Sequence, residues 1–130
     1  MSLVAEQAAF LLDACKLIAK ATELGFTVTG GELARTIDQQ QIYVKTGRSK
    51  TMNSIHIKRC AIDLNFFKDG KLCYDIPALT PVGEYWQSLN PKNQWGGFWK
   101  SFKDVPHFDG RDPVKAGIDL AMNNKRVRAA

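Results

Sequence analysis

The sequence has few of the features that mark a cross-linked or membrane-bound protein. Its three cysteines, Cys15, Cys60 and Cys73, are odd in number and include no Cys-x-x-Cys pair. This argues against a disulfide framework or a cysteine zinc knuckle, and it fits synthesis in a reducing compartment. No run of about 18 apolar residues occurs, so no membrane insertion is expected. Asp13 and Lys16 interrupt the apolar positions near the N-terminus, so no signal peptide is predicted.

Size and charge narrow the class of protein further. The 130 residues predict one domain, residues 1–130, with enough chain to bury a core. The net charge of +5 favours polyanionic partners, such as nucleic acid or the anionic bacterial cell wall. The basic residues are spread along the chain and no zinc-finger or RNA-binding signature accompanies them. Nucleic acid is therefore not an expected partner, and tight, salt-sensitive DNA binding would reverse this expectation.

The first predicted element is an amphipathic helix over residues 3–24, which Gly25 ends. Its predicted buried stripe is Val4, Ala8, Leu11, Leu12, Cys15, Ile18, Ala19 and Thr22, with Leu17 and Ala21 at the edge.

The remaining elements alternate between short strands and helices. The sequence predicts a strand at 26–29 with a continuation over 32–36, and then a helix at 38–44 capped by Thr36. A hairpin follows, with strands at 61–67 and 72–74 joined by an Asp69-Gly70 turn. The last predicted elements are a loop at 75–81, a helix at 82–89 capped by Thr80, a turn-rich loop at 90–97, a strand at 105–108 and a helix at 112–123. This order is typical of an α+β fold, a small antiparallel sheet with helices packed on one face.

Both histidines of the chain have a carboxylate at a short offset. His56 precedes Asp63 by seven residues, and Asp104 precedes His107 by three. Two imidazoles and a carboxylate are a good ligand set for zinc, and a fourth position left to water is typical of a catalytic site. The second carboxylate can then act as a base on that water.

Each of these residues also has an ordinary structural interpretation. His56 can be a surface or hydrogen-bonded histidine. Asp63 interrupts an apolar strand, which is costly unless the carboxylate is paired or metal-bound, but on an edge strand it can face solvent. Asp104 can be a surface loop carboxylate beside Lys103.

The spacing of these residues resembles a known family. Ser54-x-His56-x-x-x-x-Ala-x-Asp63-Leu, followed by Trp95-Gly-Gly and then by Asp104-x-x-His-Phe, is similar to the zinc peptidases that cut peptidoglycan peptides. These LAS-type enzymes include D-Ala-D-Ala carboxypeptidases and the L-alanyl-D-glutamate endopeptidases of phages. The resemblance covers about residues 10–108 and implies the hedgehog/DD-peptidase fold, with the metal on the open face of the sheet.

The resemblance also implies a role for each residue of the pattern. His56, Asp63 and His107 would bind Zn²⁺, and Asp104 would be the catalytic acid or base. Arg35 lies in an Arg-Thr-x-x-Gln segment similar to the family's, whose arginine faces the substrate and can stabilise an oxyanion.

The expected substrate site consists of Arg35, Ser54 and Trp95. The alternative role for Arg35 is a salt bridge to Glu32 or Asp38. Ser54 would orient a ligand or substrate, since no spare histidine exists to activate it as a nucleophile. Trp95 would wall the substrate cleft, or would be an ordinary core residue.

One position departs from the pattern. Many relatives have glycine three residues after the first histidine, where this chain has Arg59. Glycine there would allow a positive φ or a close backbone approach. Arg59 either takes a permitted conformation itself or reaches back towards Asp63 or the substrate.

The resemblance implies an enzyme that acts on peptidoglycan stem peptides as a monomer. The expected function is an L-alanyl-D-glutamate endopeptidase acting as a phage or prophage endolysin. Such an enzyme would stay in the cytoplasm until host lysis and then reach the periplasm and cell wall. The alternatives are a D-Ala-D-Ala carboxypeptidase and a non-catalytic zinc-containing module that binds the cell wall. A carboxylate is present at position 104, where the resemblance expects the catalytic acid or base, and this favours an enzyme over the binding module.

Overall fold

The computed structural model describes residues 2–49, 56 and 59–111. Its elements in chain order are α1 (Leu3–Glu23), β1 (Thr27–Gly30), α2 (Ile37–Lys45), β2 (Ala61–Lys68), β3 (Lys71–Cys73), α3 (Ile76–Leu89), β4 (Gln94–Trp95), the 3-10 helix η2 (Gly96–Phe98) and β5 (His107–Asp109).

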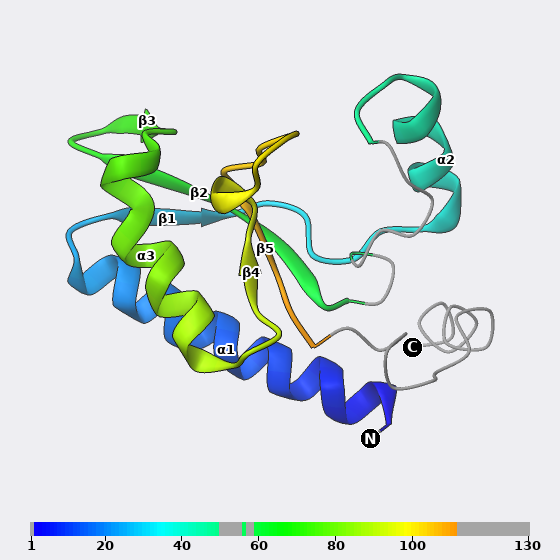
Figure 1. Cartoon of the computed structure of the whole chain (residues 1–130), viewed down its shortest axis with the longest axis horizontal. Coiled ribbons are helices and arrows are strands. Elements are labelled where there is room, and N and C mark those ends of the chain that lie inside the picture. Colours follow the sequence, from blue (N-terminus) through cyan, green and yellow to red (C-terminus); the bar gives the residue numbers. More distant parts are fainter. Residues whose placement is uncertain (1, 50–55, 57–58, 112–130) are drawn as a thin grey trace.

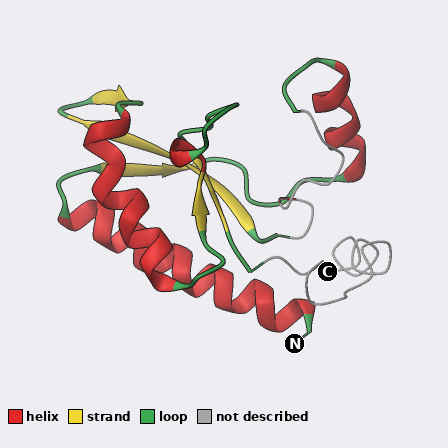
Figure 2. Ribbon diagram, in the orientation of Figure 1, coloured by secondary structure: helices red, strands yellow, loops and turns green. Residues whose placement is uncertain are grey.

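The fold is the predicted α+β arrangement around a small antiparallel sheet. The strand order is β1-β2-β5-β4, and β3 pairs with β2 through the predicted hairpin. Figure 1 shows α1 and α3 side by side along the sheet, with α2 well apart from both. Figure 2, in the same orientation, shows that long loops connect β1 to α2 and η2 to β5. These loops contribute to the candidate site.

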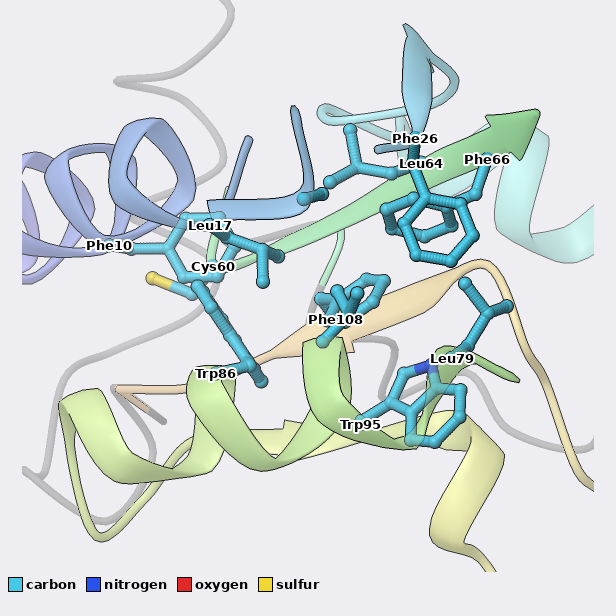
Figure 3. Close-up of a cluster of buried hydrophobic side chains, with 12 residues drawn as sticks. Phe10, Leu17, Phe26, Cys60, Leu64, Phe66, Leu79, Trp86, Trp95 and Phe108 are labelled. Atoms are coloured by element: carbon cyan, nitrogen blue, oxygen red, sulfur yellow. The ribbon is translucent and has the colours of Figure 1, made fainter. Parts of the chain in front are cut away.

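The core lies between the sheet and the two long helices. Phe10 of α1, Trp86 of α3 and Phe108 of β5 are fully buried there, and the Trp86 ring packs edge-on against both phenyl rings. Leu64 and Phe66 contribute from β2 (Figure 3). Because side chains alternate along a strand, Asp63 and Asn65 point to the opposite face of the sheet. The sheet therefore has one apolar face towards the helices and one polar face.

The helix α1 is confirmed, but the predicted buried stripe is wrong. Val4, Leu11 and Leu12 are more than half exposed, whereas Phe10 and Leu17 are completely buried. The buried face also includes Leu3, Glu6, Asp13, Ala14 and Ala21. Apolar residues occur nearly all round this helix, so periodicity alone does not select a face. The selection depends on tertiary partners: the buried carboxylate of Asp13 accepts hydrogen bonds from Asn93 and Arg111.

The helix α3 begins six residues before its predicted start. The Asp75 carboxylate caps it by accepting a hydrogen bond from the Ala78 amide at 3.0 Å. Pro81, predicted to open the helix, lies inside it and removes one hydrogen bond of the helical ladder. Burial of Leu79, Val82 and Trp86 offsets this cost. An earlier cap and a strongly buried face thus override the Thr80-Pro81 start signal.

The other predictions differ mainly at element ends. The strand predicted at 26–29, the Thr36-capped helix and the 61–67 strand are confirmed. Asp69 and Gly70 take the positive φ values of the tight turn, 52° and 76°. Residues 32–36 do not continue β1, the predicted 90–97 loop contains β4, and the last described strand is His107–Asp109 rather than 105–108. The predicted 112–123 helix lies outside the described residues. Within the described residues, no helix combines the length and apolar character needed to cross a membrane.

Candidate metal centre

The register of two neighbouring strands brings Asp63 and His107 together. Asp63 of β2 lies directly opposite His107 of β5 in the antiparallel pair. Directly opposed residues of an antiparallel pair project to the same face of the sheet. Both side chains therefore lie on the polar face, away from the core that Leu64 and Phe108 fill. The Asp63 Oδ1 atom is 3.7 Å from the His107 Nδ1 atom.

His56 reaches the same point from the segment before β2. Its side chain is buried, and its Nε2 atom lies 3.3 Å from Asp63 Oδ1. Its Nδ1 atom lies 3.2 Å from the Leu33 carbonyl oxygen, to which it can donate a hydrogen bond. The Leu33 carbonyl thus favours the tautomer in which Nε2 has a free lone pair towards Asp63.

His107 is held in the same manner by a carboxylate. Its Nε2 atom lies 2.7 Å from Oδ2 of Asp109, so an N–H there donates to Asp109 and leaves Nδ1 to face Asp63. The two imidazole rings lie with their centroids 5.2 Å apart. A metal-binding histidine commonly donates its second N–H to a carboxylate or a carbonyl, and both histidines here do so.

These three residues fit a zinc ion. One ligand atom from each of His56, Asp63 and His107 lies within 4.8 Å of the other two. The Asp63 Oδ1 atom is buried and accepts no hydrogen bond in the described structure, which is costly for a carboxylate oxygen unless a cation occupies the site. Burial alone would raise the pKa of Asp63, but the neighbouring His107 and His56 imidazoles hold it far below its usual range. Two neutral imidazoles and one ionised carboxylate match a catalytic zinc site with one open position.

Metal binding at this cluster is expected to strengthen as the pH rises from about 7 to about 9. Burial would lower the pKa of His107, but its hydrogen bond to the Asp109 carboxylate and the nearby Asp63 carboxylate raise it to about 9. The metal-free imidazole is therefore protonated at neutral pH and must release a proton to bind a metal. The apparent zinc affinity should increase about tenfold per pH unit and level off near the pKa. Competition with a chromophoric chelator measures this slope, and a flat profile between these pH values would contradict it.

Asp104 lies beside the cluster on the loop between η2 and β5. Its backbone carbonyl accepts a hydrogen bond from the His107 amide at 3.1 Å, and its amide donates to the Gly96 carbonyl at 3.1 Å. Burial raises the pKa of the Asp104 carboxyl, and the nearby His107 partly offsets this effect. A carboxylate with a raised pKa exchanges protons more readily near neutral pH, as a general base must.

Gly96 fixes the position of this loop. A Cβ atom added at Gly96 would lie 2.1 Å from the Asp104 backbone oxygen, which is far inside contact distance. We expect Gly96→Ala to displace Asp104, to lower activity and to reduce the free energy of unfolding by about 1–3 kcal/mol. Gly30→Ala is the matched control, because a Cβ atom at Gly30 meets nothing within 4 Å. Denaturant unfolding of both variants tests this, and equal stabilities would contradict the close approach.

Arg35 forms a salt bridge to Glu32, which was the predicted alternative to a role in substrate binding. Its Nε donates to the Glu32 carboxylate, one terminal nitrogen donates to Gln40 Oε1 at 2.7 Å, and its guanidinium lies over the Tyr43 ring at 4.7 Å. Its backbone amide also donates to the His56 carbonyl. The positive charge of Arg35 lowers the pKa of Asp104, so it acts on the site electrostatically.

The structure does not support a substrate contact for Trp95. This side chain has no exposed surface: it stacks on Phe108 in the core and its indole N–H donates to the Val105 carbonyl at 2.7 Å. Trp95 is therefore a core residue that supports the loop before His107. Ser54 lies outside the described residues. Arg59 has a φ of 56°, so it takes the left-handed conformation that glycine would provide at this position.

Sequence reasoning missed two residues that contact His107. Asp109 follows His107 by two residues in a strand, a spacing that places both side chains on one face, so the pattern contained this signal. The Trp99 ring centroid lies 5.0 Å from the His107 ring. The sequence motif indicated Trp95 instead of Trp99, and the different exposure of the two side chains arises from the turn at η2.

The comparisons with known proteins agree with this geometry. A family model described as D-alanyl-D-alanine carboxypeptidase matches residues 47–110. Among solved structures, the fold is similar to that of the L-Ala D-Glu endopeptidase ChiX from Serratia marcescens, with a TM-score of 0.64 and 22% sequence identity over 82% of this chain and 83% of that chain. No curated protein matches the sequence. The matched segment contains His56, Asp63, Asp104 and His107, and the match supports the resemblance that the sequence pattern predicted.

Proposed function

We propose that this protein is a zinc-dependent peptidase that hydrolyses the L-Ala–D-Glu bond of peptidoglycan stem peptides. The main observation behind this proposal is the His56–Asp63–His107 cluster, whose histidines are buried, with the Asp104 carboxyl beside it. Similarity to an L-Ala D-Glu endopeptidase over most of both chains supports this choice of bond.

The chain's own residues account for most of the proposed chemistry. Zinc, when bound by the three ligands, would supply the positive charge that acidifies water and polarises a peptide carbonyl. The Leu33 carbonyl and the Asp109 carboxylate hold the two imidazoles in the tautomers that such binding needs. Asp104 takes a proton from the attacking water and then protonates the leaving amine. Arg35 contributes positive charge towards anionic groups of the substrate.

The second candidate is a D-Ala-D-Ala carboxypeptidase, which the description of the matching family model favours. The two bonds differ in what surrounds them. The L-Ala–D-Glu bond is internal to the stem, whereas the D-Ala–D-Ala bond ends in a free carboxylate.

We propose, from the resemblance, that the protein acts as a phage or prophage endolysin that reaches the wall after host lysis.

Digestion of purified peptidoglycan tests these proposals. Zinc-loaded protein is incubated with and without a chelator, and new termini are identified by mass spectrometry. The expected result is chelator-sensitive release of N-terminal D-Glu. Released D-Ala would select the carboxypeptidase instead. No cleavage by zinc-loaded protein would contradict both and favour a wall-binding module.

A further inference from the structure

A cavity lies beside β4, and Trp99 connects it to the surroundings of the metal centre. It has a volume of about 450 Å³, and its lining includes Gln87, Gln94, Phe98, Trp99 and Lys100. Trp99 is shared between the two sites, because its ring also lies 5.0 Å from the His107 ring. A substrate that reaches the metal ligands can therefore extend past Trp99 into this cavity.

The lining has a distinctive chemistry. Phe98 is 37% exposed and presents an aromatic face, and the buried Trp95 ring packs edge-on against it. The side chains of Gln87 and Gln94 supply amide donors and acceptors, and Lys100 is the one charged residue among the described lining residues. Aromatic faces with a few amides suit a ligand that has C–H faces, hydroxyls and amides, and they do not suit a multiply charged peptide.

The opposite side of the metal centre has a different character. The sheet order places β1 on one side of the β2–β5 pair and β4 on the other. Arg35 follows β1, and its guanidinium and that of Arg48 both lie over the Tyr43 ring. The site thus has one side with two arginines, of which Arg35 is paired with Glu32, and one aromatic side, which can orient a substrate with one anionic and one neutral end.

We propose that the cavity beside Trp99 binds the N-acetylated sugar that carries the stem peptide in peptidoglycan. This rests on the proposed L-Ala–D-Glu cleavage, because L-Ala is the residue attached to the lactyl group of that sugar. The sugar then lies one residue from the scissile bond, and the acidic D-Glu lies beyond that bond on the Arg35 side. The sugar's C–H face packs on Phe98 and Trp99, and its acetamide and hydroxyls bond to the glutamine amides. The enzyme is then selective for stems that are still attached to glycan.

Two matched substrates test this. One is the free stem peptide, and the other is the same peptide with N-acetylmuramic acid on its L-Ala. We expect kcat/KM about tenfold higher for the sugar-bearing substrate, a typical gain from a neighbouring contact. Phe98→Ala and Gln94→Ala should remove this preference and leave zinc content and free-peptide cleavage unchanged. Tyr74→Ala, an exposed aromatic after β3 and outside the cavity lining, is the matched control.

The outcomes separate the subsite from the peptidase function. Equal cleavage of both substrates by the unmodified protein, or equal losses on both substrates in the variants, would overturn the subsite and leave the peptidase function standing. A binding measurement keeps the test independent of activity: N-acetylmuramoyl-L-alanine should shift the NMR signal of the Trp99 indole, and Phe98→Ala should weaken that shift. If neither substrate is cleaved but this shift occurs, the proposed function fails and the subsite stands. Absence of the shift overturns the subsite.

Discussion

Replacing Asp63 with asparagine is expected to abolish zinc binding and peptidase activity together. Asp63 supplies the only anionic ligand of the cluster, and its Oδ1 atom lies between the two imidazoles, 3.3 Å from His56 Nε2 and 3.7 Å from His107 Nδ1. Asparagine preserves the shape but removes the charge that attracts the cation. Loss of an outer partner of a metal ligand costs about 10–100-fold in affinity, so loss of this direct ligand should cost more.

Zinc content after dialysis and chelator competition measure the effect of Asp63→Asn. Glu84→Gln, which neutralises an exposed carboxylate of α3, is the matched control and should retain zinc and activity. An Asp63→Asn protein that binds one zinc ion with unchanged affinity would show that Asp63 is not a ligand. Far-ultraviolet circular dichroism distinguishes loss of metal from loss of fold.

Replacing Asp104 with asparagine should have the second large effect, and it should act on catalysis alone. A positioned general base typically contributes about 10²–10⁴-fold to the rate, so kcat should fall by that factor. Zinc affinity should stay close to that of the unmodified protein, because Asp104 is outside the three-residue cluster. Asparagine keeps the backbone hydrogen bonds of Asp104 with Gly96 and His107, so the loop should stay in place.

Asp104→Glu separates the chemistry from the position in this second experiment. It retains a carboxylate on a longer side chain and should recover part of the activity that Asp104→Asn loses. The asparagine variant with its zinc retained and full activity would remove Asp104 from the mechanism. A loss of zinc in the asparagine variant would instead mean that Asp104 contributes to the metal site.

Many parts of the fold could be predicted from the sequence because they depend on interactions between residues close together in the chain. The Asp69-Gly70 turn follows from the positive φ that these residues accept, and the Thr36 cap follows from a side-chain bond three residues along. The start of α3 was missed because two valid caps, Asp75 and Thr80, compete within one segment. Only the burial of the residues between them decides which one is used.

The sequence by itself determined the residue types that can hold a metal. The two histidines stand out because the chain has no others, Asp63 because it interrupts an apolar strand, and Asp104 by its offset from His107. Tertiary structure decided the arrangement. The register of β2 against β5 sets Asp63 opposite His107, and a shift of one residue would move Asp63 to the apolar face. Packing also decided that Trp95 is core while Trp99 contacts His107, and that Asp13 is buried while Leu12 is exposed. These choices depend on contacts between segments far apart in the chain, which local pattern does not encode.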